Sequence, residues 1–308
     1  MVYDLIIIGG GPAGSAAAVY AARKRLSTLL IVHEWGGQST VSSDIQNWIG
    51  TPSISGDELA RSLKVHVEAY ADDVLSTKFG EYVTNVAKIG EKHFSVTTQK
   101  ETYEARSILI ASGASRRKLE VPGAKEFENK GVVYCASCDG PLFSGMDVAV
   151  IGGGNAGFES AAQLLAYCKS VTLLTHGDSF RADEITQKNV LAHPNMKSIL
   201  NAEITGVTGE QFVTGLSYKD QKTGEEHSLP VAAVFVEIGI IPNTDYAKDV
   251  VTLDKYARIE IDPWTQRTNT LGIWAAGDCS NVRYHQNNIA AGDAVKALED
   301  IYLFLKSE

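Results

Sequence analysis

The chain has 308 residues, of which 44% are hydrophobic and 21% charged, and its formal net charge is −9. This length favours two domains, and the acidic balance excludes a nucleic-acid-binding surface, which would need a basic face. No apolar run approaches the roughly 18 residues that span a bilayer, and the N-terminus lacks the basic region of a signal peptide, so we expect a cytoplasmic protein with no membrane partner.

The first predicted element is an apolar strand that leads into a glycine turn and an alanine-rich helix, in the stretch YDLIIIGGGPAGSAAAVYAAR. Gly9, Gly11 and Gly14 have the spacing of a dinucleotide-binding turn: they permit the tight turn, the close approach of a pyrophosphate, and helix–strand packing. Pro12 and Ala13 open the helix, whose free N–H groups can bind phosphate.

The following elements extend this first unit. Glu34 stands 25 residues after Gly9, past the next apolar strand, where an acid would hydrogen-bond an adenosine ribose; a solvated loop glutamate is the alternative. An amphipathic helix is predicted over 56–70, and alternating strands over 92–99 and 101–113.

Cys135 and Cys138 form a Cys-x-x-Cys pair that Asp139 follows directly. The other two cysteines stand alone and the histidines show no ligand spacing, so no metal site is predicted. A disulfide across this short loop would stabilise the fold little.

The stretch MDVAVIGGGNAGFESAAQLLA repeats the strand, glycine turn and helix. Its motif residues are Gly152, Gly154, Asn155, Ala156 and Gly157. Two such turns, each followed later by a strand that ends in glycine, predict two dinucleotide-binding domains; the alternative is two metabolite-binding α/β domains without cofactors.

The last part of the chain completes the second unit and returns to the first. Strands are predicted over 211–220 and 225–239, then around RIEID at 258–262 and LGIWAAGD at 271–278, before a final helix over 287–305. The predicted fold class is therefore α/β, with two Rossmann-like domains, the first discontinuous, each with a β-meander insertion.

Along its whole length the chain resembles the low-molecular-weight thioredoxin reductases and the homologous part of the alkyl hydroperoxide reductase flavoprotein. The resemblance rests on GGGPAG, GGQ at 36–38, ASGA at 111–114, the Cys-x-x-Cys-Asp-Gly of 135–140, GGGNAG, and AAGDCSNVRYHQ at 275–286. It implies an FAD-binding domain over 1–114 and 245–308, and a pyridine-nucleotide-type domain over 115–244 that carries the cysteines. The further FAD-binding residues that it implies are Gly37, Gln38, Asn47, Ala111, Ser112, Gly113, Gly277, Asp278, His285, Gln286 and Asn287.

The same resemblance gives the cysteine pair a redox role. It implies that Cys138 faces the flavin and that Cys135 is the interchange thiol, while Asp139 would give and take the protons of the thiols. A turn residue is the alternative reading of Asp139.

The nucleotide of the second domain is open. Members of the family that use NADP carry His-Arg-Arg and a later arginine where this chain has Thr175, His176 and Gly177 followed by Arg181. A 2′-phosphate is best held by several arginines, so NADPH is disfavoured and NADH slightly favoured. Reduced ferredoxin, with no use of NAD(P)H, is the alternative electron donor.

These observations predict an FAD-dependent disulfide reductase that passes electrons to thioredoxin or to a thioredoxin- or glutaredoxin-like protein, and the resemblance implies a homodimer. The alternatives are a small-molecule dithiol oxidase that uses oxygen and a non-enzymatic flavin-binding regulatory protein.

Overall fold

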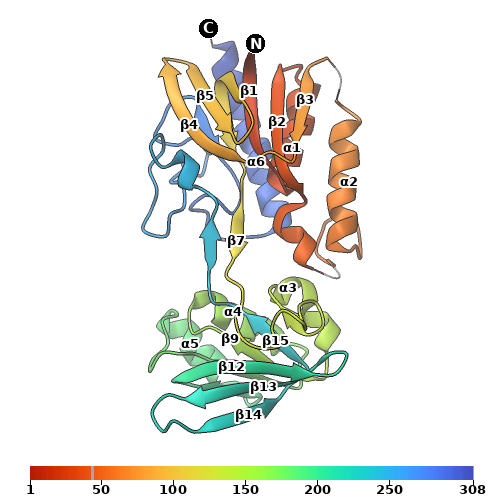
Figure 1. Cartoon of the computed structure of the whole chain (residues 1–308), viewed down its shortest axis with the longest axis vertical. Helices are drawn as coiled ribbons and strands as arrows, with labels where there is room; N and C mark the ends of the chain where they lie inside the picture. Colours follow the sequence, from red (N-terminus) through yellow and green to blue (C-terminus); the bar gives the residue numbers. More distant parts are fainter. Residues whose placement is uncertain (43–44, 72, 308) are drawn as a thin grey trace. The chain divides into compact units, whose positions relative to one another are not determined.

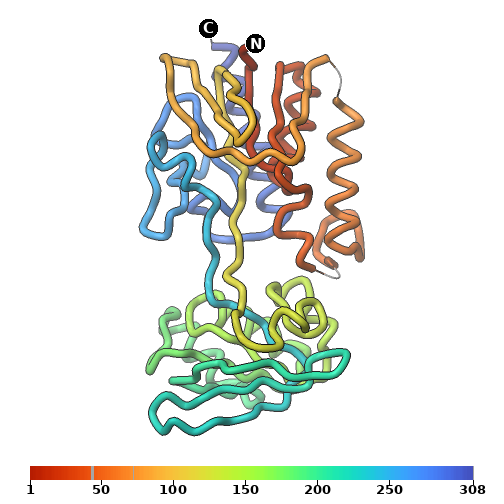
Figure 2. The backbone as a smooth tube through the Cα atoms, viewed as in Figure 1, coloured from red at the N-terminus to blue at the C-terminus, as the bar shows by residue number. Residues whose placement is uncertain are grey.

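The computed structural model describes residues 1–42, 45–71 and 73–307. Contacts divide the chain into two compact units. The first unit comprises Met1–Thr40, Gly56–Ser115 and Ile241–Glu308, and the second comprises Val41–Ser55 and Arg116–Ile240. Apart from the segment Val41–Ser55, the chain passes from the first unit to the second near residue 115 and returns near residue 240 (Figure 2).

The first unit contains a seven-stranded sheet and three long helices (Figure 1). Its elements are β1 (Val2–Gly10), α1 (Pro12–Arg23), β2 (Thr28–Trp35), η1 (Gly37–Val41), α2 (Gly56–Glu68), β3 (Leu75–Phe79), β4 (Val83–Gly90), β5 (His93–Thr98), β6 (Thr102–Ile110), η3 (Asp245–Ala247), β17 (Ile273–Ala275) and α6 (Asn287–Lys306).

The strands of this sheet follow the order β3-β2-β1-β6-β5-β4, and β17 also pairs with β6. The pairs that involve β1, β2, β3 and β17 are parallel, whereas β4, β5 and β6 pair antiparallel. The parallel strands end at one edge of the sheet, which is where α/β domains bind their ligands.

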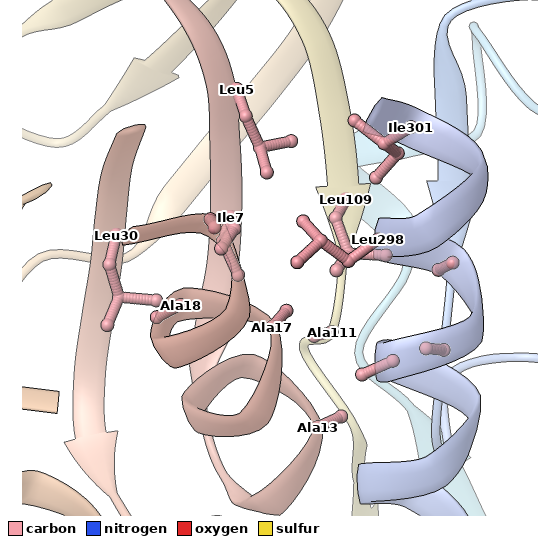
Figure 3. Close-up of a cluster of buried hydrophobic side chains, with 14 of the residues drawn as sticks. Leu5, Ile7, Ala13, Ala17, Ala18, Leu30, Leu109, Ala111, Leu298 and Ile301 are labelled. Carbon is pink, nitrogen blue, oxygen red and sulfur yellow. The ribbon is translucent and has the colours of Figure 1, made fainter. Parts of the chain in front are cut away.

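Helix α1 packs closely on the sheet because its inner face consists of alanines. Alanine has a high helix propensity and its small side chain lets a helix approach its neighbours. Ala13, Ala17 and Ala18 join one buried cluster with side chains of β1 and α6, as the close-up shows (Figure 3). This packing places the N-terminus of α1 beside the carboxyl end of β1.

The second unit repeats the plan on a smaller scale. Its elements are β8 (Val132–Val133), α3 (Ala136–Asp139), η2 (Gly140–Phe143), β9 (Asp147–Ile151), α4 (Asn155–Leu164), β10 (Ser170–Leu174), α5 (Glu184–Leu191), β11 (Met196–Ile199), β12 (Ala202–Gly209), β13 (Val213–Asp220), β14 (Glu226–Pro230) and β15 (Ala233–Val236). The order β11-β10-β9-β15-β8 forms a parallel sheet, and β12-β13-β14 form an antiparallel meander.

Two short strands, β7 (Ala114–Arg116) and β16 (Ile240–Pro242), pair where the chain crosses between the units. The predicted fold class is confirmed in its α/β sheets and its β-meanders. The predicted strand around 258–262 is wrong: Ile259 makes isolated bridges, to Leu253 and Ser280. The stretch 225–239 forms two strands because the chain bends between β14 and β15.

Across the described part of the chain, no helix is both long enough and apolar enough to cross a membrane.

Candidate functional site

Two of the three motif glycines in the first turn, Gly9 and Gly14, have no room for a side chain. Gly9 has φ +120°, and a Cβ there would lie 2.2 Å from the carbonyl oxygen of Ala111. A Cβ at Gly14 would lie 1.8 Å from the Gly9 carbonyl oxygen. These two glycines therefore hold helix α1 against the end of β1.

Gly11 differs from its two neighbours in the motif. A Cβ there would meet no atom nearer than 3.9 Å, so the backbone at the start of α1 is open for the close approach of a phosphate. Ala13 lies beside Gly277: a Cβ added at Gly277 would lie 3.4 Å from the Cβ of Ala13. The turn and the segment that precedes Asp278 thus meet, and their geometry fits a dinucleotide such as FAD.

Polar contacts bring further predicted residues to this end of the first unit. His285 Nδ1 donates to Asp278 Oδ1 at 3.2 Å. Asn287, the first residue of α6, accepts a hydrogen bond from Ser39 Oγ at 3.1 Å. Ser39 belongs to η1, so this bond joins the GGQ segment to the C-terminal helix.

Ser112 and Gly113 are held by a residue that sequence reasoning missed. Ser112 Oγ donates to the carbonyl oxygen of Asn243 at 2.6 Å, and Asn243 Nδ2 donates to the Ser112 carbonyl at 3.0 Å. The Asn243 N–H donates to the Gly113 carbonyl, and Ser115 Oγ donates to Asn243 Oδ1. No sequence signal links Asn243 to a serine 131 residues away.

The remaining predicted FAD residues lie around the same sheet edge or in the segment after it. Glu34 is exposed at the carboxyl end of β2, and its carbonyl oxygen lies close to Gly10. Gly37 and Gln38 begin η1, and Gln286 precedes α6. Asn47 is partly buried in the segment Val41–Ser55, which the contacts group with the second unit.

Cys135 and Cys138 form a disulfide with their Cα atoms 5.3 Å apart. The pair lies on α3: Cys135 is its N-cap and Cys138 is within its single turn. Cys135 is partly exposed, whereas Cys138 is 8% exposed and Asp139 only 1% exposed. Cys135 is thus the more exposed residue of the pair, and a buried carboxyl group adjoins Cys138.

Helix α4 packs against the turn that carries the disulfide. Ser137 Oγ donates to Gln163 Oε1 at 2.9 Å. Gly140 fits against the ring of Tyr167, because a Cβ at Gly140 would lie 2.9 Å from the tyrosine oxygen. The helix that begins at the second glycine turn therefore also supports the disulfide.

The second glycine turn has the geometry of the first. Gly152 has φ +132°, and a Cβ there would lie 2.1 Å from the Glu237 carbonyl oxygen. A Cβ at Gly157 would lie 1.9 Å from the Gly152 carbonyl oxygen, whereas a Cβ at Gly154 would meet nothing within 4 Å. Asn155 and Ala156 are exposed at the start of α4.

The loop after β10 folds back onto this turn. The Arg181 N–H donates to the Gly153 carbonyl, and the Asp183 N–H donates to Asn155 Oδ1, both at 2.8 Å. His176 is exposed at the end of β10 and accepts a hydrogen bond at Nδ1 from Gln221 Nε2 at 2.8 Å. Gln221 comes from the turn after β13 and was not foreseen.

The two other cysteines are buried, and their thiols have low reactivity. Burial raises the pKa of the Cys279 thiol to about 11, and it donates to the carbonyl oxygens of Ile110 and Ala276. Burial also raises the pKa of the Cys168 thiol to about 11. Because the thiolate is the reactive form, neither residue competes with the Cys135–Cys138 pair.

Known proteins of similar sequence support this arrangement. The chain is 42% identical over 296 residues to an alkyl hydroperoxide reductase subunit of Escherichia coli, and 39% identical over 298 residues to an NADH dehydrogenase of Bacillus subtilis. Each alignment covers 96% of this chain but 57% of the relative, so the chain spans little more than half the length of these relatives.

Solved structures match along nearly the whole chain. Thioredoxin reductase from Streptococcus pyogenes superposes with a TM-score of 0.90 at 34% identity, covering 100% of this chain and 99% of its own. Thioredoxin reductase from Giardia duodenalis gives 0.92 at 31% identity, covering 98% of each chain. The family description "Pyridine nucleotide-disulphide oxidoreductase" matches residues 3–294, and the chain belongs to this family of oxidoreductases.

Proposed function

We propose that the protein is an FAD-dependent disulfide reductase that reduces thioredoxin, or a thioredoxin- or glutaredoxin-like protein, through Cys135 and Cys138, with NADH as the favoured electron donor. The observation that carries the proposal is the disulfide on α3, in which Cys135 is partly exposed and Cys138 is followed by a buried carboxyl group.

FAD is proposed to bind the domain formed by 1–114 and 245–308. The residues proposed to hold it are the Gly9–Gly14 turn, Glu34, Gly37, Gln38, Asn47, Ala111–Gly113, Gly277, Asp278 and His285–Asn287. When bound, FAD supplies the two electrons that return the cysteine pair to the dithiol. Gly11 supports this assignment because it leaves backbone without a covering side chain at the helix N-terminus.

The reduced cysteines then carry the exchange. The Cys135 thiolate attacks one sulfur of the partner disulfide, which breaks that bond, forms a mixed disulfide and releases one partner thiolate. The Cys138 thiolate next attacks Cys135 Sγ, re-forming the internal disulfide and releasing the second partner thiolate. The partner gains two electrons and two protons, and Asp139 is proposed to handle the proton that leaves Cys138.

The exposure of the two residues supports this order, because Cys135 is more exposed than Cys138. Leu142 and Met146 follow α3 in the sequence, and their exposed apolar side chains offer a surface on which a protein partner can pack.

The second domain, 115–244, is proposed to bind the donor through Gly152, Gly154, Asn155, Ala156 and Gly157, with His176 and Arg181 at the ribose end. One relative of this chain is an NADH dehydrogenase, which supports NADH. His176 accepts a hydrogen bond from the uncharged side chain of Gln221. Arg181 is then the arginine that this loop offers to a 2′-phosphate. Because a 2′-phosphate is best held by several arginines, this disfavours NADPH.

The test is an anaerobic titration of the FAD-loaded protein with NADH and, separately, NADPH, followed by oxidised thioredoxin. We expect NADH to bleach the flavin absorbance and added thioredoxin to restore it, with one thioredoxin disulfide reduced per NADH. Cys138→Ser should still bind FAD but leave thioredoxin oxidised.

Other results would replace parts of the proposal. Bleaching by reduced ferredoxin alone would change the donor. Rapid reoxidation by oxygen with a small dithiol, and none with thioredoxin, would indicate a dithiol oxidase. No reduction by any donor would leave a flavin-binding regulatory protein. A homodimer is also proposed, and sedimentation velocity measures it directly.

A further inference from the structure

The two glycine turns of this chain are built alike, but the residue that lies behind the turn differs between them. In the first unit the Ala111 N–H donates to the Ile8 carbonyl, and Ala111 lies directly beside Gly9. In the second unit the Glu237 N–H donates to the Ile151 carbonyl, and Glu237 lies directly beside Gly152. Glu237 thus occupies in the second unit the place of Ala111 in the first.

The helix residue that lies near this position also differs between the two units. Ala17 stands six residues after Gly11 and is fully buried, and Figure 3 shows Ala17 and Ala111 in the apolar core. Ser160 stands six residues after Gly154, and its Oγ donates to Glu237 Oε1 at 2.7 Å. An apolar pair in one unit is a hydrogen-bonded serine and carboxyl group in the other.

The carboxyl group lies near the place where phosphate charge would bind. Ser160 is the sixth residue of α4, so it lies about 8 Å along the helix axis from the N-terminus at 1.5 Å per residue. The charged groups that face Glu237 are Arg116 from β7 and Glu159 from α4. Burial is the largest influence and raises the pKa of Glu237, against the opposing effects of Arg116 and Ser160.

We propose that Glu237 links dinucleotide binding in the second unit to proton uptake, so that the nucleotide binds tightly when this carboxyl group is protonated and weakly when it is ionised. This inference rests on the proposed nucleotide site of the second unit. Two phosphate charges at the N-terminus of α4 repel an ionised carboxylate behind the turn, and they raise its pKa further when they bind.

The charges determine whether the affinity for the nucleotide rises or falls with pH. Below its pKa Glu237 is neutral and does not oppose the phosphates; as the pH rises through that pKa the affinity falls. If the charges are separated by about 8 Å, the axial distance of Ser160 from the start of α4, an effective dielectric constant near 20 gives a repulsion that corresponds to a loss of affinity of about tenfold or more.

The experiment measures binding of NAD+ to the FAD-loaded protein by isothermal titration calorimetry between pH 5.5 and 8.5, in pairs of buffers with different ionisation enthalpies. We expect the wild type to lose about tenfold in affinity as Glu237 ionises and to take up protons on binding. Glu237→Gln should keep the low-pH affinity throughout and take up none. Ser160→Ala removes a donor to the carboxylate, so it should move the fall to higher pH.

His176 belongs to the same proposed nucleotide site, so His176→Asn is the matched control. The proposal requires that His176→Asn retain the fall in affinity and the proton uptake. If the fall persists in Glu237→Gln, or disappears only in His176→Asn, the inference is overturned while the nucleotide site stands. If neither the wild type nor Glu237→Gln binds NAD+ at any pH, with FAD content and circular dichroism native, the proposed nucleotide site itself fails and the inference with it.

Discussion

The second glycine turn allows the requirements of folding to be separated from those of binding with two alanine substitutions. A Cβ at Gly157 would lie 1.9 Å from the Gly152 carbonyl oxygen, far inside any van der Waals contact, so α4 must move away from β9. A Cβ at Gly154 would meet nothing within 4 Å, and its φ of −94° and ψ of −176° suit alanine. One variant therefore changes the protein's interior and the other changes only the surface offered to a ligand.

The two variants should therefore differ in how much they change stability and NAD+ affinity. We expect Gly157→Ala to lower the free energy of unfolding by about 3 kcal/mol or more, as overpacking against a fixed backbone does. Gly154→Ala should change it by less than about 1 kcal/mol, since the residue is exposed to ligand and not to the core. Its methyl group fills the space in which a pyrophosphate approaches the backbone, so the affinity for NAD+ should fall at least about tenfold, or about 1.4 kcal/mol.

Urea denaturation followed by circular dichroism measures the first effect, and calorimetric titration with NAD+ measures the second. Gly11→Ala in the first turn is the matched control, because it should lower FAD retention and leave NAD+ binding intact. Wild-type stability in Gly157→Ala would refute the steric argument, and unchanged NAD+ affinity in Gly154→Ala would refute the assignment of the open backbone to phosphate.

Three further predictions concern the cysteines and the crossing between the units. Reduced Cys138→Ser should trap a partner as a stable mixed disulfide on Cys135, visible by mass spectrometry, whereas Cys135→Ser should trap none; equal trapping by both would contradict the assigned order of attack. Asn243→Ala should lower the free energy of unfolding by roughly 1–2 kcal/mol, because two side-chain hydrogen bonds are lost. An unchanged urea midpoint would show that these hydrogen bonds of Asn243 do not stabilise the fold. Because burial raises the pKa of Cys279 to about 11, the folded protein keeps a proton that the unfolded chain loses above about pH 8.5, so stability falls as the pH rises. We expect Cys279 to contribute roughly 1–2 kcal/mol of that fall between pH 8.5 and 10, and Cys279→Ala should remove this share in pH-dependent urea denaturation.

The sequence by itself determined the features that depend on near neighbours. The glycine spacings, the alanine-rich helix and the Cys-x-x-Cys pair lie within a few residues, where backbone dihedral preferences and helix periodicity decide the outcome. The order of these motifs was enough to predict two Rossmann-like units and the class of oxidoreductase.

Only the tertiary structure decided which distant residues meet. Ser39 and Asn287 are 248 residues apart, and Gln221 reaches His176 from a separate meander. Glu237 could have been found by aligning the strands that follow the two turns, but its partner Ser160 depends on which face of α4 lies against β15. Such contacts follow from strand order and helix packing, which no local pattern encodes. The chain around Ile259 failed as a predicted strand for the same reason, because within the described residues its neighbours offer it isolated bridges and not a continuous strand.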